Sequence, residues 1–197
     1  KNPGVYAYAN ALASFYVREA RFDDAEKAIR KYASDNPDSN NAKKYLISFL
    51  RQHVSQDAAI AQVNSYIDSD PDKSEFKLML ADLYLFVGEK EQGLGVLNAL
   101  VESDPRSTGS IDARNMMVKI YLKDQNQALV DKNIKEVLDI EPENETALLV
   151  RSGLKLQAGE LKEGIADLRV VLKNNPQNTF ALKGLIGALE LNGNEQL

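Results

Sequence analysis

The sequence predicts an all-α protein, a solenoid of about five and a half helix–turn–helix repeats, from three observations. The prolines recur at steps of 34, 34, 34, 37 and 34 residues. Because proline lacks a backbone donor and clashes inside a helix, a proline at a fixed phase marks the same junction in each repeat. Between the prolines, apolar residues recur at helical spacing. The composition, 44% hydrophobic and 27% charged, is typical of a folded chain. The six prolines are Pro3, Pro37, Pro71, Pro105, Pro142 and Pro176.

Each repeat is expected to hold two helices. The residue before each proline from Pro37 onward is Asn, Asp or Glu, which suits a turn or a helix cap. A second break divides the two helices of a repeat, and glycine there tolerates the left-handed conformation that ends a helix. These breaks are expected at Ala20, Gly88, Gly159 and Gly193.

The first and third repeats, residues 6–39 and 74–107, carry the same pattern of large and small apolar residues. In the first repeat the pattern is Leu12, Ala13, Tyr16, Ala25, Ile29 and Tyr32, and in the third it is Leu80, Ala81, Tyr84, Gly93, Leu97 and Leu100. The second repeat, residues 40–73, keeps Leu46, Leu50, Ala59, Val63 and Tyr66. The fourth, residues 111–144, keeps Val118, Tyr121, Ile134 and Val137, and three extra residues are expected before it, within 106–110.

The fifth repeat, residues 145–178, departs most, because Arg151 and Lys155 occupy apolar positions of the pattern. We expect their stems to pack while their charged ends reach water, and an ion-pairing or ligand-binding role is the alternative. The sixth repeat, residues 179–197, supplies only a first helix, Phe180 to Leu191. Leu182, Leu185, Ile186 and Leu189 would then be partly uncovered, so self-association through this helix is expected. The start at Lys1 and the unfinished repeat predict a piece excised from a longer protein.

These spacings resemble the tetratricopeptide repeat (TPR) family, whose repeat is a 34-residue helix–turn–helix. The resemblance covers nearly the whole chain. It implies a single domain over residues 1–197, a right-handed α-solenoid of about five and a half such repeats. It also implies that the first helices of successive repeats line a concave groove that binds an extended peptide or a helix of a partner.

The groove positions implied by the resemblance change character along the chain. The first two repeats place Asn10, Ser14, Arg18, Ser48 and Arg51 or Gln52 there, which makes this end polar and mildly basic. Later repeats supply leucine, methionine and phenylalanine, which suit an apolar face of a partner helix. Leu85, Leu122 and Leu156 could instead pack between adjacent repeats and not face the groove. The residues we select for the partner-binding groove are Lys44, Tyr45, Leu78, Met79, Asp82, Phe86, Asn115, Met116, Lys119, Leu149 and Val150.

Some members of the family bind a partner's C-terminal carboxylate with Lys, Asn and Arg from three consecutive repeats. The matching positions from the second repeat onward retain only the lysine, Lys44. The other positions hold Ser48, Met79, Asp112 and Met116. This kind of recognition is therefore not expected.

Catalytic and metal chemistry find little support in the sequence. There is no cysteine, and His53 is the one histidine, expected to be structural at a helix C-terminus. The Gly93–Gly95 motif lies inside a predicted helix, and the acidic run of residues 141–145 lacks the spacing of a calcium loop. We expect no enzyme activity, no cofactor and no metal.

The net charge of −5 argues against a nucleic acid partner, and no apolar run is long enough to span a membrane. The predicted function is a non-catalytic scaffold for a protein or peptide partner. Two alternatives stay open: a component of bacterial envelope assembly, secretion or polysaccharide export, or a docking segment of a larger enzyme. The lack of cysteine and the start at Lys1 favour the bacterial periplasm or envelope over the cytoplasm.

Overall fold

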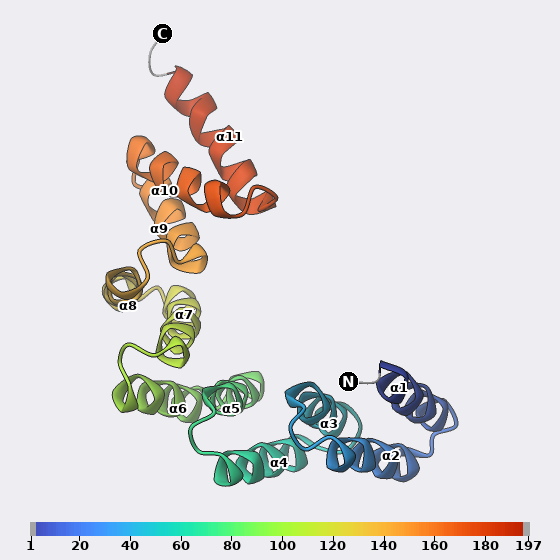
Figure 1. Cartoon of the computed structure of the whole chain (residues 1–197). Helices are drawn as coiled ribbons and strands as arrows, with labels where there is room; N and C mark the ends of the chain where they lie inside the picture. Colours follow the sequence, from blue (N-terminus) through green and yellow to red (C-terminus); the bar gives the residue numbers. More distant parts are fainter. Residues whose placement is uncertain (1–2, 195–197) are drawn as a thin grey trace. The chain divides into compact units, whose positions relative to one another are not determined.

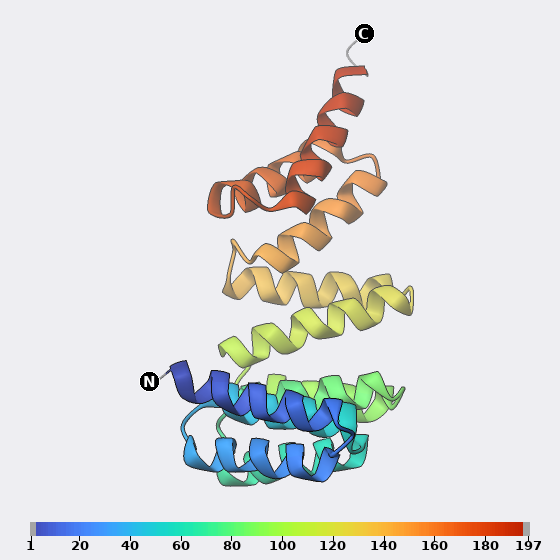
Figure 2. The same ribbon diagram turned by 90° about the vertical axis from the view of Figure 1, so that its right-hand side faces the viewer.

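The computed structural model describes residues 3–194 (Figures 1 and 2). Over this range the chain forms eleven α-helices and no strand, as the sequence predicts. The helices are α1 (Pro3–Arg18), α2 (Phe22–Asp35), α3 (Asn40–His53), α4 (Gln56–Ser69), α5 (Ser74–Phe86), α6 (Lys90–Ser103), α7 (Thr108–Lys123), α8 (Gln127–Ile140), α9 (Glu145–Gln157), α10 (Leu161–Asn174) and α11 (Thr179–Asn194).

The helices fall into two compact units, which are described separately. The N-terminal unit ends at Val96 and the C-terminal unit begins at Leu97, so the boundary lies within α6. In the N-terminal unit, α1, α3 and α5 are the first helices of their pairs, and α2 and α4 pack against them on one side (Figure 1). In the C-terminal unit, α7, α9 and α11 alternate with α8 and α10.

Most of the prolines stand at a fixed distance before a helix cap, which explains why they recur at such regular steps along the sequence. The residue two positions after a proline caps the next helix, and at four of these junctions its side chain accepts a hydrogen bond from a backbone N–H of the first turn. Such bonds run from Ala42 to Ser39 (3.3 Å), from Ser110 to Ser107 (3.1 Å), from Ala147 to Asn144 (3.0 Å) and from Ala181 to Asn178 (2.9 Å). Lys73, which precedes α5, makes no such bond. Pro3 differs, because it is the first residue of α1.

The turn inside most pairs contains one residue in the left-handed conformation. Gly88 (φ +85°), Gly159 (φ +80°) and Ala20 (φ +57°) confirm three of the expected breaks. Gln125 (φ +56°) performs the same role between α7 and α8, where the sequence offers no glycine. The break expected at Gly193 is wrong, because α11 continues through this residue to Asn194.

The three extra residues of the fourth repeat form an additional turn at the start of α7. This helix has 16 residues, whereas α5 and α9 have 13 each. The added turn buries Ser110, whose Oγ donates to the carbonyl of Pro105 (3.0 Å). Arg114 lies one turn later, contacts Ser110 Oγ and the Pro105 carbonyl through Nη1, and donates from Nε to Glu136 (2.8 Å). The inserted turn is therefore tied to both the preceding junction and α8.

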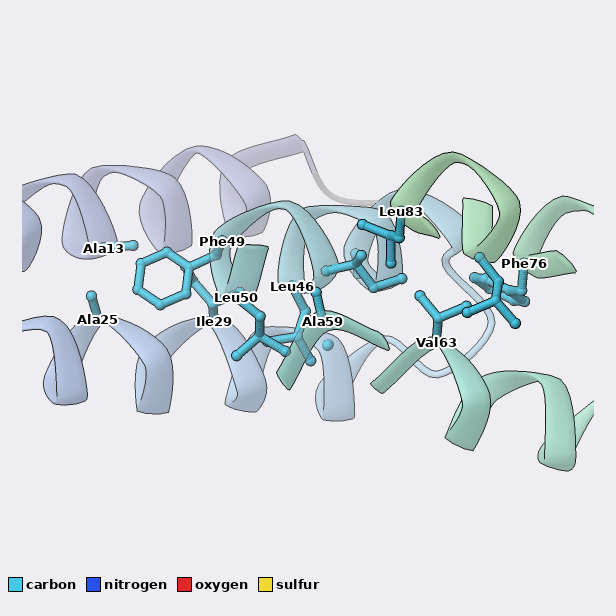
Figure 3. Close-up of a cluster of buried hydrophobic side chains, with 14 residues drawn as sticks. Ala13, Ala25, Ile29, Leu46, Phe49, Leu50, Ala59, Val63, Phe76 and Leu83 are labelled. Atoms are coloured by element: carbon cyan, nitrogen blue, oxygen red, sulfur yellow. The ribbon is translucent and has the colours of Figure 1, made fainter. Parts of the chain in front are cut away.

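The core of the N-terminal unit is a continuous set of apolar side chains between the two helix layers. Figure 3 shows Ala13 of α1 and Ala25 of α2 facing each other, with Phe49 and Leu50 of α3 beside them. Ala13 and Ala25 are 1% and 0% exposed, so the two helices approach closely at this point. Val63 and Phe76 continue the core towards α5. The small residues of the repeat pattern thus mark the close contacts between paired helices.

The C-terminal unit contains an ion-pair network that corrects our interpretation of the fifth repeat. Arg151 of α9 makes a two-bond contact with the carboxylate of Asp167 on α10, with Nε–Oδ2 and Nη2–Oδ1 distances of 2.8 Å. Lys155 lies 3.4 Å from the same carboxylate. Asp167 is a buried residue. The two basic side chains therefore pair with a buried acid, where we had expected their charged ends to reach water.

Candidate functional site

The first-helix surface of the N-terminal unit, formed by α1, α3 and α5, contains an open hollow of about 330 Å³ between α1 and α3. Ala13, Val17 and Phe49 give it an apolar floor, while serine, arginine and glutamine side chains stand around it. Its lining residues are Ala13, Ser14, Val17, Arg18, Tyr45, Ser48, Phe49, Gln52 and His53. Of the residues selected from the sequence, only Tyr45 lines this hollow.

Lys44 and Tyr45 lie on α3 and contact the neighbouring first helices. The Tyr45 hydroxyl donates to Asn10 Oδ1 on α1 (2.9 Å), and Lys44 forms an ion pair with Glu75 on α5. Burial, with a smaller contribution from Tyr6, raises the pKa of Tyr45. Tyr45 therefore stays neutral at physiological pH, and its hydroxyl, which donates to Asn10, can still accept a hydrogen bond.

The selected residues of α5 differ in exposure. Leu78 and Met79 are half-buried, and Met79 packs against the core of the unit. Asp82 is exposed and lies 4.0 Å from Arg51 of α3. The guanidinium carbon of Arg51 also lies 5.1 Å from the ring centre of Phe86, which is 69% exposed. Arg51 thus joins α3 to both polar and aromatic groups of α5.

The selected residues of the C-terminal unit lie on α7 and α9. Asn115 donates from Nδ2 to Asn144 Oδ1 (3.4 Å), and its own Oδ1 is buried with no hydrogen-bond partner among the described residues. Met116 is half-buried and Lys119 is exposed. Leu149 and Val150 are half-buried and pack against apolar clusters of the unit. Lys119 is therefore the most accessible of these five side chains.

Leu85 and Leu156 pack within their own helix pairs. A Cβ built on Gly93 of α6 would lie 2.9 Å from Leu85 Cγ, and one built on Gly164 of α10 would lie 2.7 Å from Leu156 Cδ2. Leu122 is the third leucine that the sequence could place either in the groove or in the packing, and it is 38% exposed. Leu85 and Leu156 thus occupy the space that a larger side chain at Gly93 or Gly164 would need.

His53 lines the hollow, which the sequence analysis did not predict. Its ring lies between Phe22 of α2, with ring centres 5.6 Å apart, and Phe49 of α3, 4.9 Å apart. The expected structural role at the end of α3 and the position in the wall of the hollow are therefore compatible. The position of His53 could have been inferred from Phe22, the aromatic residue that begins α2, because its ring stacks on the imidazole of His53.

The described part of the chain shows no grouping of acidic and histidine side chains suited to a metal ion. None of the helices in residues 3–194 combines the length and the apolar character needed to cross a membrane. Other surface features of the described residues are the hollow between α1 and α3, a second hollow of about 220 Å³ lined by Ile134, Leu138 and Arg151 among others, and the exposed Phe86.

Comparison with known proteins agrees with this geometry. Residues 8–74 match the family model for the tetratricopeptide repeat. The sequence matches no curated protein. A thermophilic TPR protein of Thermus thermophilus is similar in structure, with a TM-score of 0.60 and 17% identity over 93% of this chain and 98% of that chain.

Two further solved structures share the fold. The type IV pilus biogenesis factor PilW has a TM-score of 0.56 and 15% identity over 100% of this chain and 94% of that chain. The first TPR domain of Spaghetti, bound to an HSP90 peptide, has a TM-score of 0.53 and 15% identity over 63% of this chain and 96% of that chain. Residues 8–74 thus match the tetratricopeptide repeat, and the paired-helix fold of the described residues is the fold of solved tetratricopeptide repeat proteins.

Proposed function

We propose that the chain is a non-catalytic scaffold that binds an extended peptide or a helix of a partner protein on the first-helix surface of its N-terminal unit. TPR folds are protein–protein interaction scaffolds, and the Spaghetti domain holds a peptide. The observation that carries the proposal is the open hollow between α1 and α3, which has an apolar floor and polar walls. A concave surface of this kind suits a segment with an apolar anchor and a hydrogen-bonding backbone.

The charges around the hollow indicate how the partner is recognised. Arg18, which lines the hollow, lies 3.8 Å from Glu19. Nearby on α3, Lys44 pairs with Glu75 and Arg51 lies near Asp82, so these three cations have acidic neighbours within the unit. Ser14, Ser48 and Gln52 can donate to or accept from a peptide backbone. Recognition by hydrogen bonds and apolar contacts is therefore favoured over recognition of a strongly charged partner.

The residues selected on the other first helices extend the proposal. Leu78, Met79, Asp82 and Phe86 would continue the binding surface along α5, and the exposed Phe86 offers a second apolar contact. Asn115, Met116, Lys119, Leu149 and Val150 would form a separate contact surface on the C-terminal unit. The assignment of these residues, and a single TPR domain over residues 1–197, stay proposals.

The proposal can be tested with peptides selected on the wild-type chain from a phage-displayed library of random sequences. The test variant is Ser14→Glu with Ser48→Glu, which places two charges at the hollow without disturbing the core. The control is Ser34→Glu with Ser65→Glu, on the exposed surfaces of α2 and α4. We avoid Met79 because it packs against the core and its loss would affect folding.

We expect the affinity of the selected peptides, measured by fluorescence anisotropy, to fall about tenfold or more in the test variant, since a desolvated charge in a contact costs at least 1.4 kcal/mol, or about tenfold. The control should bind within about twofold of the wild type, because surface substitutions away from a contact change little. Equal binding by both variants, with circular dichroism showing both to be folded, would refute the assignment of the hollow.

The more specific roles in the bacterial envelope or in a larger enzyme are also proposals. The similarity to PilW concerns the fold alone at 15% identity. A signal peptide or a lipid-anchored cysteine encoded upstream would favour the envelope role and a periplasmic location. A catalytic domain encoded downstream would favour the docking role.

A further inference from the structure

The hollow between α1 and α3 is lined by a cation and hydrogen-bond donors, with no acid among its described lining residues. Arg18 supplies a guanidinium, and His53, the one histidine of the chain, supplies an imidazole. Ser14, Ser48 and Gln52 add neutral groups that can donate hydrogen bonds. A lining with this balance of charge is complementary to an acidic group of a partner.

The imidazole of His53 is held by two aromatic rings and keeps its nitrogens unused. Its ring centre lies 5.6 Å from that of Phe22 in a stacked contact and 4.9 Å from that of Phe49. Within residues 3–194 the two nitrogens take part in no hydrogen bond, and neither nitrogen is fully buried. An imidazole with a fixed ring and unused nitrogens therefore borders the hollow.

The carboxylates on the helices and turns around His53 stand outside the hollow. They are Glu19, Asp23, Asp24, Asp57 and Asp82, and none of them is a lining residue. Asp24 pairs with Arg21 (2.7 Å), and Asp82 lies 4.0 Å from Arg51. Glu19 lies 3.8 Å from Arg18, which is longer than a hydrogen bond. The guanidinium of Arg18 therefore keeps its N–H donors for a ligand.

We propose that Arg18 and His53 together bind a side-chain carboxylate of the partner, an aspartate or glutamate beside its apolar anchor, and that protonation of His53 strengthens this contact. The inference rests on the proposed peptide-binding function and adds the chemistry of the bound segment. One carboxylate suits the hollow, because the other lining residues are neutral. The rest of the segment is held by hydrogen bonds and apolar contacts.

The direction of the pH effect follows from the charges. Histidine changes its charge between about pH 5 and about pH 8. The neutral imidazole of His53 can donate one hydrogen bond, whereas the imidazolium donates from both nitrogens and adds a positive charge beside Arg18. Affinity for the acidic segment should therefore rise as the pH falls, as long as the carboxylate of the segment stays ionised, which requires a pH above about 5.

The probes for the test are fluorescein-labelled peptides selected on the wild-type chain from a phage-displayed library of random sequences. Their C-termini are amidated, so that only side chains supply carboxylates. We expect the selected sequences to carry an aspartate or glutamate close to an apolar residue. Fluorescence anisotropy at about pH 5.5 and about pH 8 measures their affinity on either side of the histidine titration.

The affinity should be about fivefold higher at the lower pH, which is the factor that a partly exposed ion pair contributes. Peptides in which asparagine or glutamine replaces the acidic residue should bind more weakly and lose this pH difference. This comparison uses the wild-type chain throughout, so it does not depend on the folding of any variant.

Variants of the chain separate the two basic groups. His53→Gln should bind the acidic peptides equally at both pH values. Arg18→Gln should bind about fivefold more weakly at both values and keep the pH difference, because His53 still titrates. The matched control, Lys27→Gln, removes an exposed cation of α2 outside the hollow and should bind as the wild type does. Circular dichroism at both pH values shows whether each variant is folded.

Selected peptides without an acidic residue, or with the same affinity at both pH values, would overturn this inference and leave peptide binding at the hollow in place. A pH difference that persists in His53→Gln would also overturn it, since another group would then be titrating. Unchanged binding in Ser14→Glu with Ser48→Glu would show that the peptides bind elsewhere. In that case, or if the library gives no binding peptide, the inference and the proposed function both fail.

Discussion

Asp167 shows how a single buried acid can organise two basic side chains at apolar positions. Its side chain is 8% exposed, whereas those of Arg151 and Lys155 are 38% and 25% exposed. The pKa of Arg151 is raised, chiefly by its hydrogen bond to Asp167. The ion pair therefore holds α9 against α10 at positions where other repeats use apolar contacts.

Asp167→Asn is expected to lower the free energy of unfolding by about 1 to 3 kcal/mol, because two partly buried cations lose their counter-ion. The loss is smaller than for a fully buried pair, since both cations keep some access to water. The control, Asp139→Asn, breaks the exposed pair with Lys135 and should change the free energy of unfolding far less, because water screens that pair. Urea denaturation followed by circular dichroism measures both. Equal losses would contradict the role of burial.

Asp112 predicts a dependence of stability on pH. Asp112 is an exposed residue, and partial burial of its carboxyl, followed by the nearby charge of Glu141, raises the pKa of Asp112. A raised pKa in the folded state favours the protonated form, so the contribution of this group to stability is present at low pH and is lost as the pH rises through the folded pKa.

Asp112→Asn should therefore raise the midpoint of thermal unfolding at pH 7, and the gap to the wild type should close as the pH falls towards the ordinary range of aspartate. Differential scanning calorimetry over this pH range checks the expectation. A gap that is the same at every pH would show that packing of the amide, rather than loss of the charge, causes the effect.

At the scale of the helices, the glycines of α6 illustrate two opposite roles. A Cβ on Gly93 would meet Leu85 Cγ at 2.9 Å and the carbonyl oxygen of Ala81 at 3.2 Å. A Cβ on Gly95 would meet nothing within 4 Å. Gly93 is therefore required for the approach of α5 and α6, whereas Gly95 only weakens the helix.

Gly95→Ala should raise the free energy of unfolding by up to about 1 kcal/mol through helix propensity. Gly93→Ala should lower it by about 1 to 2 kcal/mol, because the clash with Leu85 outweighs the same gain. Adding Leu85→Ala to Gly93→Ala tests the contact, since removing the clashing side chain should recover part of the loss caused by the glycine substitution. Chemical denaturation measures each variant. Stabilisation by both single substitutions would show that the helices can move apart at no cost.

Helix boundaries follow from local chemistry at most junctions. Ser39, Ser107, Asn144 and Asn178 cap helices at the phase set by the prolines. The boundary at Gln125 escaped the sequence analysis because a glutamine in the left-handed conformation has no distinctive signal. The break expected at Gly193 failed because an isolated glycine can also continue a helix.

At the scale of the whole molecule, repetition makes structure predictable from short stretches of sequence. In a solenoid each pair of helices contacts mainly its neighbours, so a pattern read in one repeat carries over to the next. The same repetition reveals α11 as the exception, since Ile186 is exposed where five equivalent residues are buried.

From its sequence this chain could be predicted to be an all-α solenoid with a TPR-like repeat and with its helix pairs in the correct order. Proline spacing, capping residues and apolar periodicity are local properties, so they are legible along the chain. Tertiary structure alone decided which groups meet: Asp167 with Arg151 and Lys155, and the hollow that α1 and α3 form around Tyr45. These contacts join side chains from different helices, and their distances depend on how the helices pack.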